Sequence, residues 1–226
     1  MTPPAVPISP SLLALVAHGV RLKVLAQIFP VLRHDVVGPL SNASLAAAML
    51  RQTPEGADAN ALQQRCQRLA GDLTVMLDDG VTIVRELDQW LADNGARTNT
   101  ATLLAECRKL MFSQLLLSRQ SVVWPEDVAE VELPQFTSRY LLLAWLLSLL
   151  QGMPADVVLT LDLSQPHAWH AHFSTHFSAP FDADPAASTE TIDPQQVELL
   201  AAASGWRLER QAQGWSLHLP APTPDK

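Results

Sequence analysis

The sequence predicts an α+β protein in which a long helical hairpin forms a dimeric four-helix bundle and is followed by an α/β sandwich. Two long stretches repeat apolar residues every three and four positions, which is the spacing of coiled-coil helices. After residue 95 the pattern changes to shorter helical and alternating segments. We therefore expect two domains, a dimerisation hairpin over 11–95 and a mixed domain over 96–220.

The composition excludes several classes of function. The chain has 226 residues, of which 48% are hydrophobic and 17% charged, so it contains enough apolar material for a packed core. Its 15 basic and 23 acidic residues give a net charge of −8. A nucleic-acid partner held by phosphate attraction is therefore not expected.

The compartment follows from what the sequence lacks. The two cysteines, Cys66 and Cys107, show neither a disulfide framework nor zinc spacing, which suits a reducing compartment. The first residues do not resemble a signal peptide. The longest apolar run, Leu141–Leu147, is far shorter than the ~20 residues that cross a bilayer. We expect a soluble, cytoplasmic protein with no membrane partner.

The first helix is expected over Ser11–Arg51. Forty helical residues would extend ~60 Å, too far to bury an apolar stripe against a small globule, so this helix needs partner helices. Leu25 and Leu32 fill one seam position of a heptad frame. The other seam position is filled by Leu15, Leu22, Phe29, Val36, Ala43 and Leu50.

The second helix follows a turn at Thr53–Asn60 and ends at the stop signal Asp93-Asn94-Gly95. Two such helices form an antiparallel hairpin that is a single layer thick, so it cannot bury both of its faces. A symmetric homodimer is the simplest way to bury both of its faces. The seam of the second helix steps strictly by four and three, through Leu62, Cys66, Leu69, Leu73, Met76, Gly80, Ile83, Leu87 and Trp90.

The remaining chain predicts helices packed on a mostly antiparallel sheet. Ser178–Pro194, rich in Ala, Asp and Pro, is expected to be a loop. The expected helices are Thr100–Ser118, Gln135–Leu150 and Gln195–Ser204, the second apolar enough to be buried on most sides. The expected strands are Ser121–Trp124, Val128–Leu133, Val157–Leu163, Trp169–Phe173, Trp206–Gln211 and Gly214–Leu219.

His34 is the first candidate for chemistry. In the heptad frame it points away from the seam, and a lone histidine there is most often a solvated surface residue. Three neighbours favour a functional role. Asp35 can orient the imidazole or stabilise its charge, Arg33 can attract a phosphoryl group, and Pro39 is expected to kink the helix one turn later.

The segment His34-Asp35-x-x-Gly38-Pro39-Leu40 resembles the phosphoacceptor box of sensor histidine kinases, and it lies on the first arm of a dimerising hairpin, as in that family. The order of elements after residue 95 resembles the ATPase domain of the same kinases. The resemblance therefore implies a histidine-kinase fold for the chain, from about residue 11 to 220.

The chain departs from the kinase pattern where ATP would bind. Trp145 and Leu149 stand where the kinases have two asparagines for magnesium and phosphates, and neither side chain offers an oxygen ligand. No glycine lies between Met153 and Gly205, so the Gly-rich nucleotide loop is missing. We expect no ATP-dependent kinase activity and no cofactor.

An acceptor box without an ATP site resembles the dimeric histidine phosphotransferases of bacterial phosphorelays. That resemblance implies His34 as the acceptor, with Asp35 and Arg33 assisting, and response-regulator receiver domains as partners that supply magnesium. Gly38 agrees with this family and replaces the Thr or Asn that kinases use for phosphatase activity. The alternative is a non-catalytic pseudo-kinase scaffold that binds response regulators, for which an occluded His34 would be expected.

Two further features can be interpreted as structural rather than functional. His167, His170, His172 and His176 could suggest a zinc site, but only His170 and His172 would share one strand face, so an incidental polar face is favoured. Cys66 is interpreted as a small core residue of the seam rather than a redox sensor.

Overall fold

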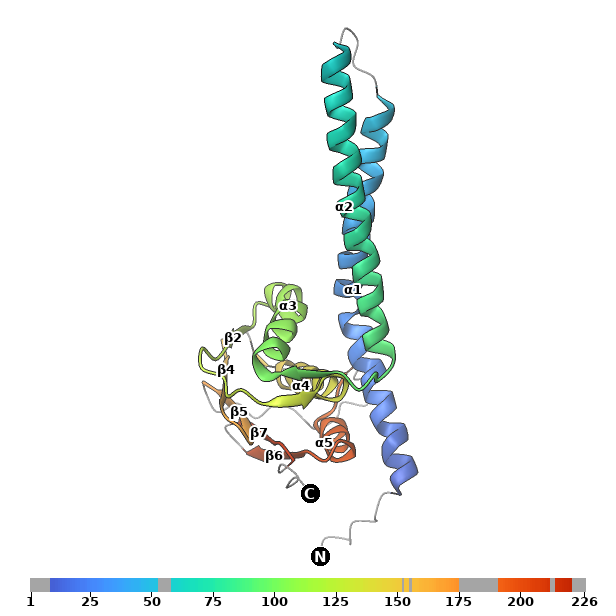
Figure 1. Ribbon diagram of the computed structural model, residues 1–226. Coiled ribbons are helices and arrows are strands. Elements are labelled where there is room, and N and C mark those ends of the chain that lie inside the picture. Colours follow the sequence, from blue (N-terminus) through green and yellow to red (C-terminus); the bar gives the residue numbers. More distant parts are fainter. Residues whose placement is uncertain are drawn as a thin grey trace, which may run out of the picture. The chain divides into compact units, whose positions relative to one another are not determined.

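The computed structural model describes residues 9–52, 58–151, 153–154, 156–174, 191–211 and 214–220. The chain divides into two compact units, one of Met1–Ile28 with Gly95–Lys226 and one of Phe29–Asn94. The predicted fold class, a helical hairpin followed by an α/β domain, is confirmed (Figure 1).

The hairpin unit contains most of helix α1 (Pro10–Arg51) and all of helix α2 (Ala59–Leu91). Helix α1 continues through Pro30 and Pro39 without ending at either. Helices α1 and α2 pack closely at Gly80, which is buried. A Cβ atom built at this residue would lie 3.5 Å from Leu40 Cδ2 and 4.0 Å from Pro39 Cβ. A methyl group at this position would therefore make ordinary van der Waals contact with the proline turn of α1, but a larger side chain would not fit.

The predicted seam of α2 is confirmed with one exception. Gly80 and Trp90 are buried, and the seam leucines, Met76 and Ile83 are half-buried. Cys66, by contrast, is exposed, so its assignment to the core was wrong. At that turn the half-buried residue is Arg65, whose guanidinium donates hydrogen bonds to the carbonyls of Met49 and Gln52 (3.1 Å each).

The predicted seam of α1 is wrong over the first half of the helix. Leu15, Leu22 and Phe29 are exposed, by 68%, 67% and 51%. The buried face is instead formed by smaller or β-branched side chains: Ala17, Val20, Val24 and Ile28. These residues belong to the same unit as the α/β domain, so this part of α1 buries the face opposite to the predicted seam. Farther along, Ala43 is buried as expected, with Val36 and Leu50 half-buried.

Polar contacts fix the start of α1 within its unit. Lys23 Nζ donates hydrogen bonds to the carbonyl of Thr191 (3.0 Å) and to Gln196 Oε1 (3.2 Å). The Arg21 guanidinium lies over the ring of Phe136, 5.2 Å from its centroid, in a cation–π contact.

Helix α1 is also long and apolar enough, by length and composition, to cross a membrane, and 22% of its most apolar window is buried. Core helices of soluble proteins satisfy the same criterion, so this is weak evidence. The expectation of a protein without a membrane partner stays a prediction.

The α/β domain contains a five-stranded sheet with the order β2-β4-β5-β7-β6. The β2–β4 pair is parallel and the other pairs are antiparallel, so the sheet is mostly antiparallel, as the sequence predicts. Helices α3, α4 and α5 lie on one face of this sheet (Figure 1). The strands are β2 (Ser121–Val123), β4 (Val158–Gln165), β5 (Ala168–Phe173), β6 (Arg207–Gln211) and β7 (Gly214–His218); the helices are α3 (Thr100–Ser118), α4 (Gln135–Leu150) and α5 (Pro194–Ala203).

Helix α4 is the centre of the core, and every residue from Ser138 to Leu150 is buried. The facing side of the sheet is apolar, with Leu159, Leu161, Trp169 and Leu217 all buried. Trp169 also makes an edge-to-face contact with Trp206, with ring centroids 5.1 Å apart. The residues that alternate with these along the strands lie on the opposite side of the sheet and are polar, among them Thr160, Asp162, His170, His172 and Ser216.

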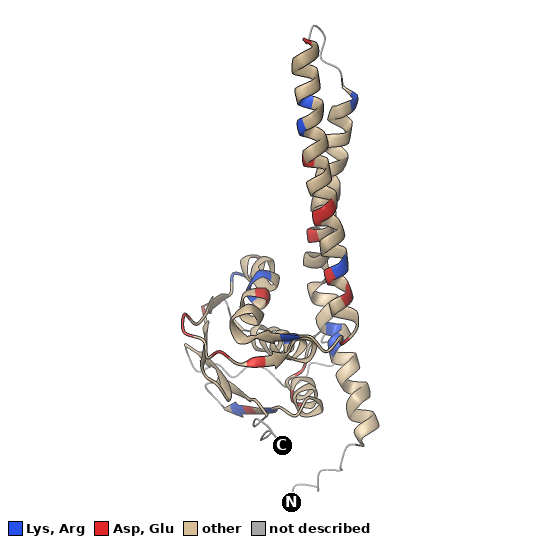
Figure 2. Cartoon of the chain, in the orientation of Figure 1, with Lys and Arg blue, Asp and Glu red and all other residues tan. Residues whose placement is uncertain are grey.

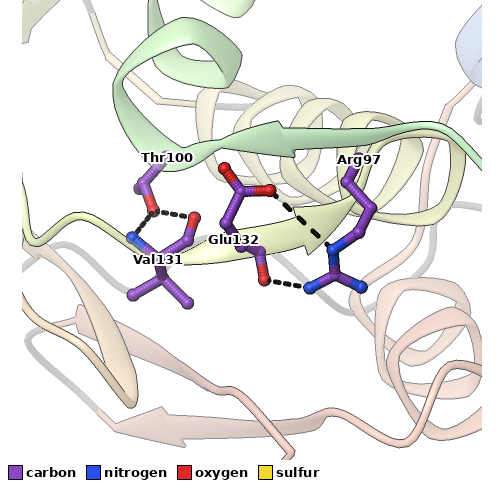
Figure 3. Close-up of polar contacts among 4 residues, drawn as sticks. All are labelled: Arg97, Thr100, Val131 and Glu132. Carbon is purple, nitrogen blue, oxygen red and sulfur yellow. Dashed lines mark hydrogen bonds and ion pairs between the residues drawn. The ribbon is translucent and has the colours of Figure 1, made fainter.

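A short two-stranded sheet begins the domain, and the sequence did not predict its first strand. Strand β1 (Arg97–Asn99) pairs antiparallel with β3 (Glu132–Pro134). Figure 3 shows the polar contacts of this pair: Arg97 donates to the carbonyl of Glu132 (2.8 Å), and Thr100 Oγ1 donates to the carbonyl of Val131 (3.2 Å) and accepts from its N–H (3.3 Å). The strand expected over Val128–Leu133 is thus largely wrong, with Val128 forming only an isolated bridge to Leu163.

Candidate functional site

His34 lies on the exposed side of α1 within the hairpin unit. Its side chain is 86% exposed, whereas Leu32, two residues earlier, is buried. The orientation agrees with the predicted one, because residues two apart on a helix point in nearly opposite directions. The imidazole is therefore accessible to a partner molecule on the surface of the hairpin.

Asp35 lies beside His34 and is partly buried. Its Oδ1 is 3.7 Å from Nδ1 of His34, and its side chain is 26% exposed. This distance exceeds that of a direct hydrogen bond but is short enough for an ion pair with a protonated imidazole. The carboxylate faces Nδ1, so the other ring nitrogen, Nε2, is the one left for chemistry with a partner.

Arg33 is exposed and precedes His34 on the helix. Successive helical residues point about 100° apart, so Arg33 and Asp35 lie on opposite sides of His34. The structure thus brings Asp35 close to the imidazole and leaves Arg33 to the side. An anionic group approaching His34 would meet a positive charge on one flank and a carboxylate on the other.

The helix surface one turn after His34 is open. Gly38 follows His34 by four residues and so lies on the same face, and a Cβ built there meets no atom within 4 Å. The next residues, Pro39 and Leu40, lie against Gly80 of α2. Helix α2 therefore supports the helix behind the site, while the glycine leaves the surface beside the imidazole uncovered.

Sequence reasoning missed two residues that shape this region. Gly80 was assigned only to the seam, although it is the contact point with the proline turn. Pro30, four residues before His34, lies within the helix as Pro39 does, although the heptad pattern gives it no role. The pair of prolines on either side of a histidine was the signal in the sequence that could have identified Pro30. No local signal identifies the contact of Gly80 with Pro39 and Leu40.

Helix α4 holds the two residues expected at the magnesium and phosphate positions. Trp145 and Leu149 are completely buried, each 0% exposed. Their apolar side chains form part of the core. The segment where a Gly-rich loop is missing from the sequence lies outside the described residues. The expectation that the chain uses no cofactor stays a prediction.

The histidine cluster is partly assembled on the polar side of the sheet. His170 and His172 stack with centroids 6.1 Å apart, and His170 Nδ1 lies 2.8 Å from Ser216 Oγ. His167 lies in the β4–β5 turn, and His176 is outside the described residues. His218 joins the cluster unexpectedly and pairs with Glu209, whose carboxylate is 3.2 Å from its Nε2.

Metal binding gains no support from this cluster. Among the residues that the structure describes, no group of three or more His, Cys, Asp or Glu side chains is placed to hold a metal ion. The pKa of nearby Asp162 is lowered, mainly by hydrogen bonds from Ser164, with smaller contributions from His170 and His172. The interpretation as a polar sheet face therefore fits the described part of the cluster.

No family model matches the chain, and no curated protein matches it. Among solved structures, the chain is similar to the Acinetobacter baumannii histidine kinase AdeS, with 11% identity, a TM-score of 0.42 and coverage of 84% of this chain and 98% of that chain. It is also similar to the cytoplasmic segment of the histidine kinase QseC, with 13% identity, a TM-score of 0.41 and coverage of 61% of this chain and 92% of that chain.

Proposed function

We propose that this chain is a phosphorelay histidine phosphotransferase that passes a phosphoryl group between response-regulator receiver domains through a phosphohistidine at His34. The observation that carries the proposal is the exposure of this imidazole, 86%, with the Asp35 carboxylate 3.7 Å from Nδ1. A receiver domain can reach Nε2 on the open surface of the hairpin. A scaffold that merely binds a partner would not need an accessible His-Asp pair.

The chemistry requires only the groups of the two proteins and the magnesium ion that the receiver binds. A phosphorylated aspartate is a mixed anhydride, and neutral imidazole is a nucleophile toward it near neutral pH. His34 Nε2 attacks phosphorus in line, a P–N bond forms, and the P–O bond breaks so that the receiver's carboxylate leaves. The imidazole keeps its Nδ1 proton and becomes cationic. The reverse step on a second receiver regenerates neutral His34.

The neighbours of His34 have separate roles in this proposal. Asp35 orients the ring through Nδ1 and stabilises the cationic phosphohistidine, and the 3.7 Å contact shortens when the charge develops. Arg33 attracts the incoming phosphoryl group from the other side of His34. Magnesium is supplied by the receiver, so the chain needs no metal ligands of its own.

We further propose that the functional form is a homodimer with a four-helix bundle. A two-helix hairpin leaves one face of each helix uncovered, and large apolar side chains are exposed on both. On α1 these include Phe29, Val37, Leu40 and Leu45, and on α2 they include Val75, Leu77, Val81 and Val84, each at least 44% exposed. Sedimentation that shows a stable monomer at micromolar concentration would contradict this proposal.

The test of the transfer function is uptake of label from a radiolabelled phospho-receiver. Wild-type protein is expected to gain label, and His34→Ala is expected to gain none. His18→Ala is the matched control, because His18 is another exposed histidine of α1. Asp35→Asn is expected to slow transfer by ~10²-fold, the low end for the loss of a positioned acid–base group.

The outcomes separate the two functions. If His34→Ala takes up label as fast as wild type, the acceptor assignment is wrong. If wild type takes up no label from any cognate receiver but binds receivers in a pull-down, the chain acts as a non-catalytic scaffold.

A further inference from the structure

A groove on the α/β domain lies beside helix α3 and has a volume of about 520 Å³. One side is a single face of α3, and the other is the segment after β2, including Trp124. Ala101 and Ala105 lie one turn apart on that face, so small side chains leave the space open. None of these residues belongs to the site at His34.

The walls of the groove are apolar and accessible. Phe112 is 65% exposed although it lines the groove, and Trp124 is half-buried on the opposite wall. The apolar surface continues past the end of the groove at Leu116, which follows Phe112 by four residues on the same face of α3 and is 68% exposed. An apolar surface of this kind on a folded domain marks an interaction site.

The charge at the groove indicates what it binds. Arg108 and Lys109 of α3 line the groove, in a chain with a net charge of −8. Figure 2 shows basic residues, in blue, on α3. Glu126 and Asp127 follow Pro125 but do not line it. The carboxylates of a ligand would therefore be attracted on the α3 side and repelled on the loop side, so the acidic side of the ligand faces α3.

We propose that this groove docks an acidic amphipathic segment of a partner protein. A bulky apolar side chain of the segment fits between Phe112 and Trp124, and an adjacent carboxylate pairs with Arg108 and Lys109. A further apolar residue of the same segment covers Leu116. A small ligand confined to the groove would leave that leucine exposed, whereas a peptide laid along α3 covers it.

The probe is a set of short fluorescein-labelled helical peptides with Leu, Phe or Trp on one face and Glu flanking them. Matched peptides with every Glu replaced by Lys are the charge controls. Wild-type protein is expected to bind at least one acidic peptide and to bind its Lys counterpart at least ~10-fold more weakly, a change of about 1.4 kcal/mol.

Variants of the full chain locate the binding. Arg108→Glu and Phe112→Ser are each expected to weaken binding by ~10-fold or more. Arg68→Glu makes the same change of charge at an exposed residue of α2, in the other structural unit, and is expected to bind as wild type does. Each variant is checked for an unchanged thermal unfolding midpoint.

Three results would overturn the proposal. They are no binding of any acidic peptide by wild type, equal binding of the Lys peptides, and unchanged binding by both Arg108→Glu and Phe112→Ser. None of them bears on phosphotransfer at His34, which uses the other structural unit.

Discussion

Arg139 of α4 contacts both oxygens of one carboxylate, that of Glu106 on α3. Its Nε donates a hydrogen bond to Oε2, and its Nη2 forms an ion pair with Oε1; each distance is 3.0 Å. The Arg139 side chain is only 4% exposed, against 27% for Glu106. A planar guanidinium matched to a carboxylate in this way holds two helices in one register.

Replacing Glu106 by Gln is expected to destabilise the α/β domain. The substitution leaves the Arg139 charge buried without its counter-ion, which costs about 3 kcal/mol, the low end of the range because Glu106 is partly exposed. Urea unfolding followed by tryptophan fluorescence measures the loss. Glu126→Gln, at an exposed residue, is the control, and an equal loss in both variants would show that the pair contributes nothing specific.

The two cysteines are expected to react at different rates. Cys66 is exposed, whereas Cys107 is buried beside the Glu106–Arg139 pair. Burial raises the pKa of the Cys107 thiol, and the charge of Glu106 raises it further, so the reactive thiolate is scarce. Iodoacetamide at about pH 8 is expected to label Cys66 alone in the native protein and both thiols in denaturant. Rapid native labelling of Cys107, read by mass spectrometry, would contradict the structure.

Tyr140 is the single tyrosine of the chain, so its ionisation can be followed without interference from another phenol. Burial raises its pKa to about 12, although the charges of Arg139 and Arg21 act in the opposite direction. Tyrosinate absorbance is expected to be small at about pH 11, where an exposed tyrosine is mostly ionised. Because the folded state holds the proton more tightly, this group's contribution to stability is full below about pH 10 and is lost as the pH rises toward 12. A midpoint near 10 in the folded protein would show that Tyr140 is solvated.

Two glycines of α2 are expected to respond differently to substitution. Gly71 is exposed and a Cβ there meets nothing within 4 Å, so Gly71→Ala is expected to stabilise the helix by up to about 1 kcal/mol. Gly80→Ala is expected to be tolerated, because its Cβ would make an ordinary contact with Leu40. Gly80→Leu has no such space and is expected to lower the unfolding midpoint. Thermal unfolding followed by circular dichroism compares the three variants, and a midpoint for Gly80→Leu equal to that of Gly80→Ala would mean that α2 is not held against Pro39 and Leu40.

Mg-ATP is expected not to bind at micromolar concentration. Trp145 and Leu149 are fully buried and offer no oxygen to a magnesium ion. Isothermal titration calorimetry is the measurement, with a functional histidine kinase as the positive control. A micromolar dissociation constant would make ATP-dependent autophosphorylation the better hypothesis.

The sequence predicts some elements closely because their signals are local. Helix α3 and helix α4 have the expected bounds, Thr100–Ser118 and Gln135–Leu150, and the seam of α2 differs only at Cys66. In each case the apolar pattern has a single interpretation. Helices α2 and α3 carry one apolar stripe, and α4 is apolar on nearly every side. Strand β1, by contrast, has only three residues and forms because it pairs with β3. A pairing between distant segments leaves no pattern in the local sequence.

The seam of α1 could not be predicted because that helix carries two apolar stripes. Leu15 and Leu22 form the larger one, yet Val20 and Val24 on the other stripe are the buried ones. Periodicity identifies a stripe but not the surface that covers it, and tertiary packing decides between the two. For the candidate site, the sequence predicts the exposure of His34, but the 3.7 Å separation from Asp35 depends on side-chain orientations that only the folded helix sets.

The prolines of α1 give the helix around His34 a distinct mechanical character. Proline has no N–H, so Pro30 cannot bond to the carbonyl of Ala26, and Pro39 cannot bond to that of Asp35. Bending stiffness is lowest where such bonds are missing, and one of these points lies on each side of the histidine. Under the proposed function, a receiver that docks at His34 would tilt the short helical segment that bears the imidazole, while the hydrogen bonds beyond both prolines stay intact.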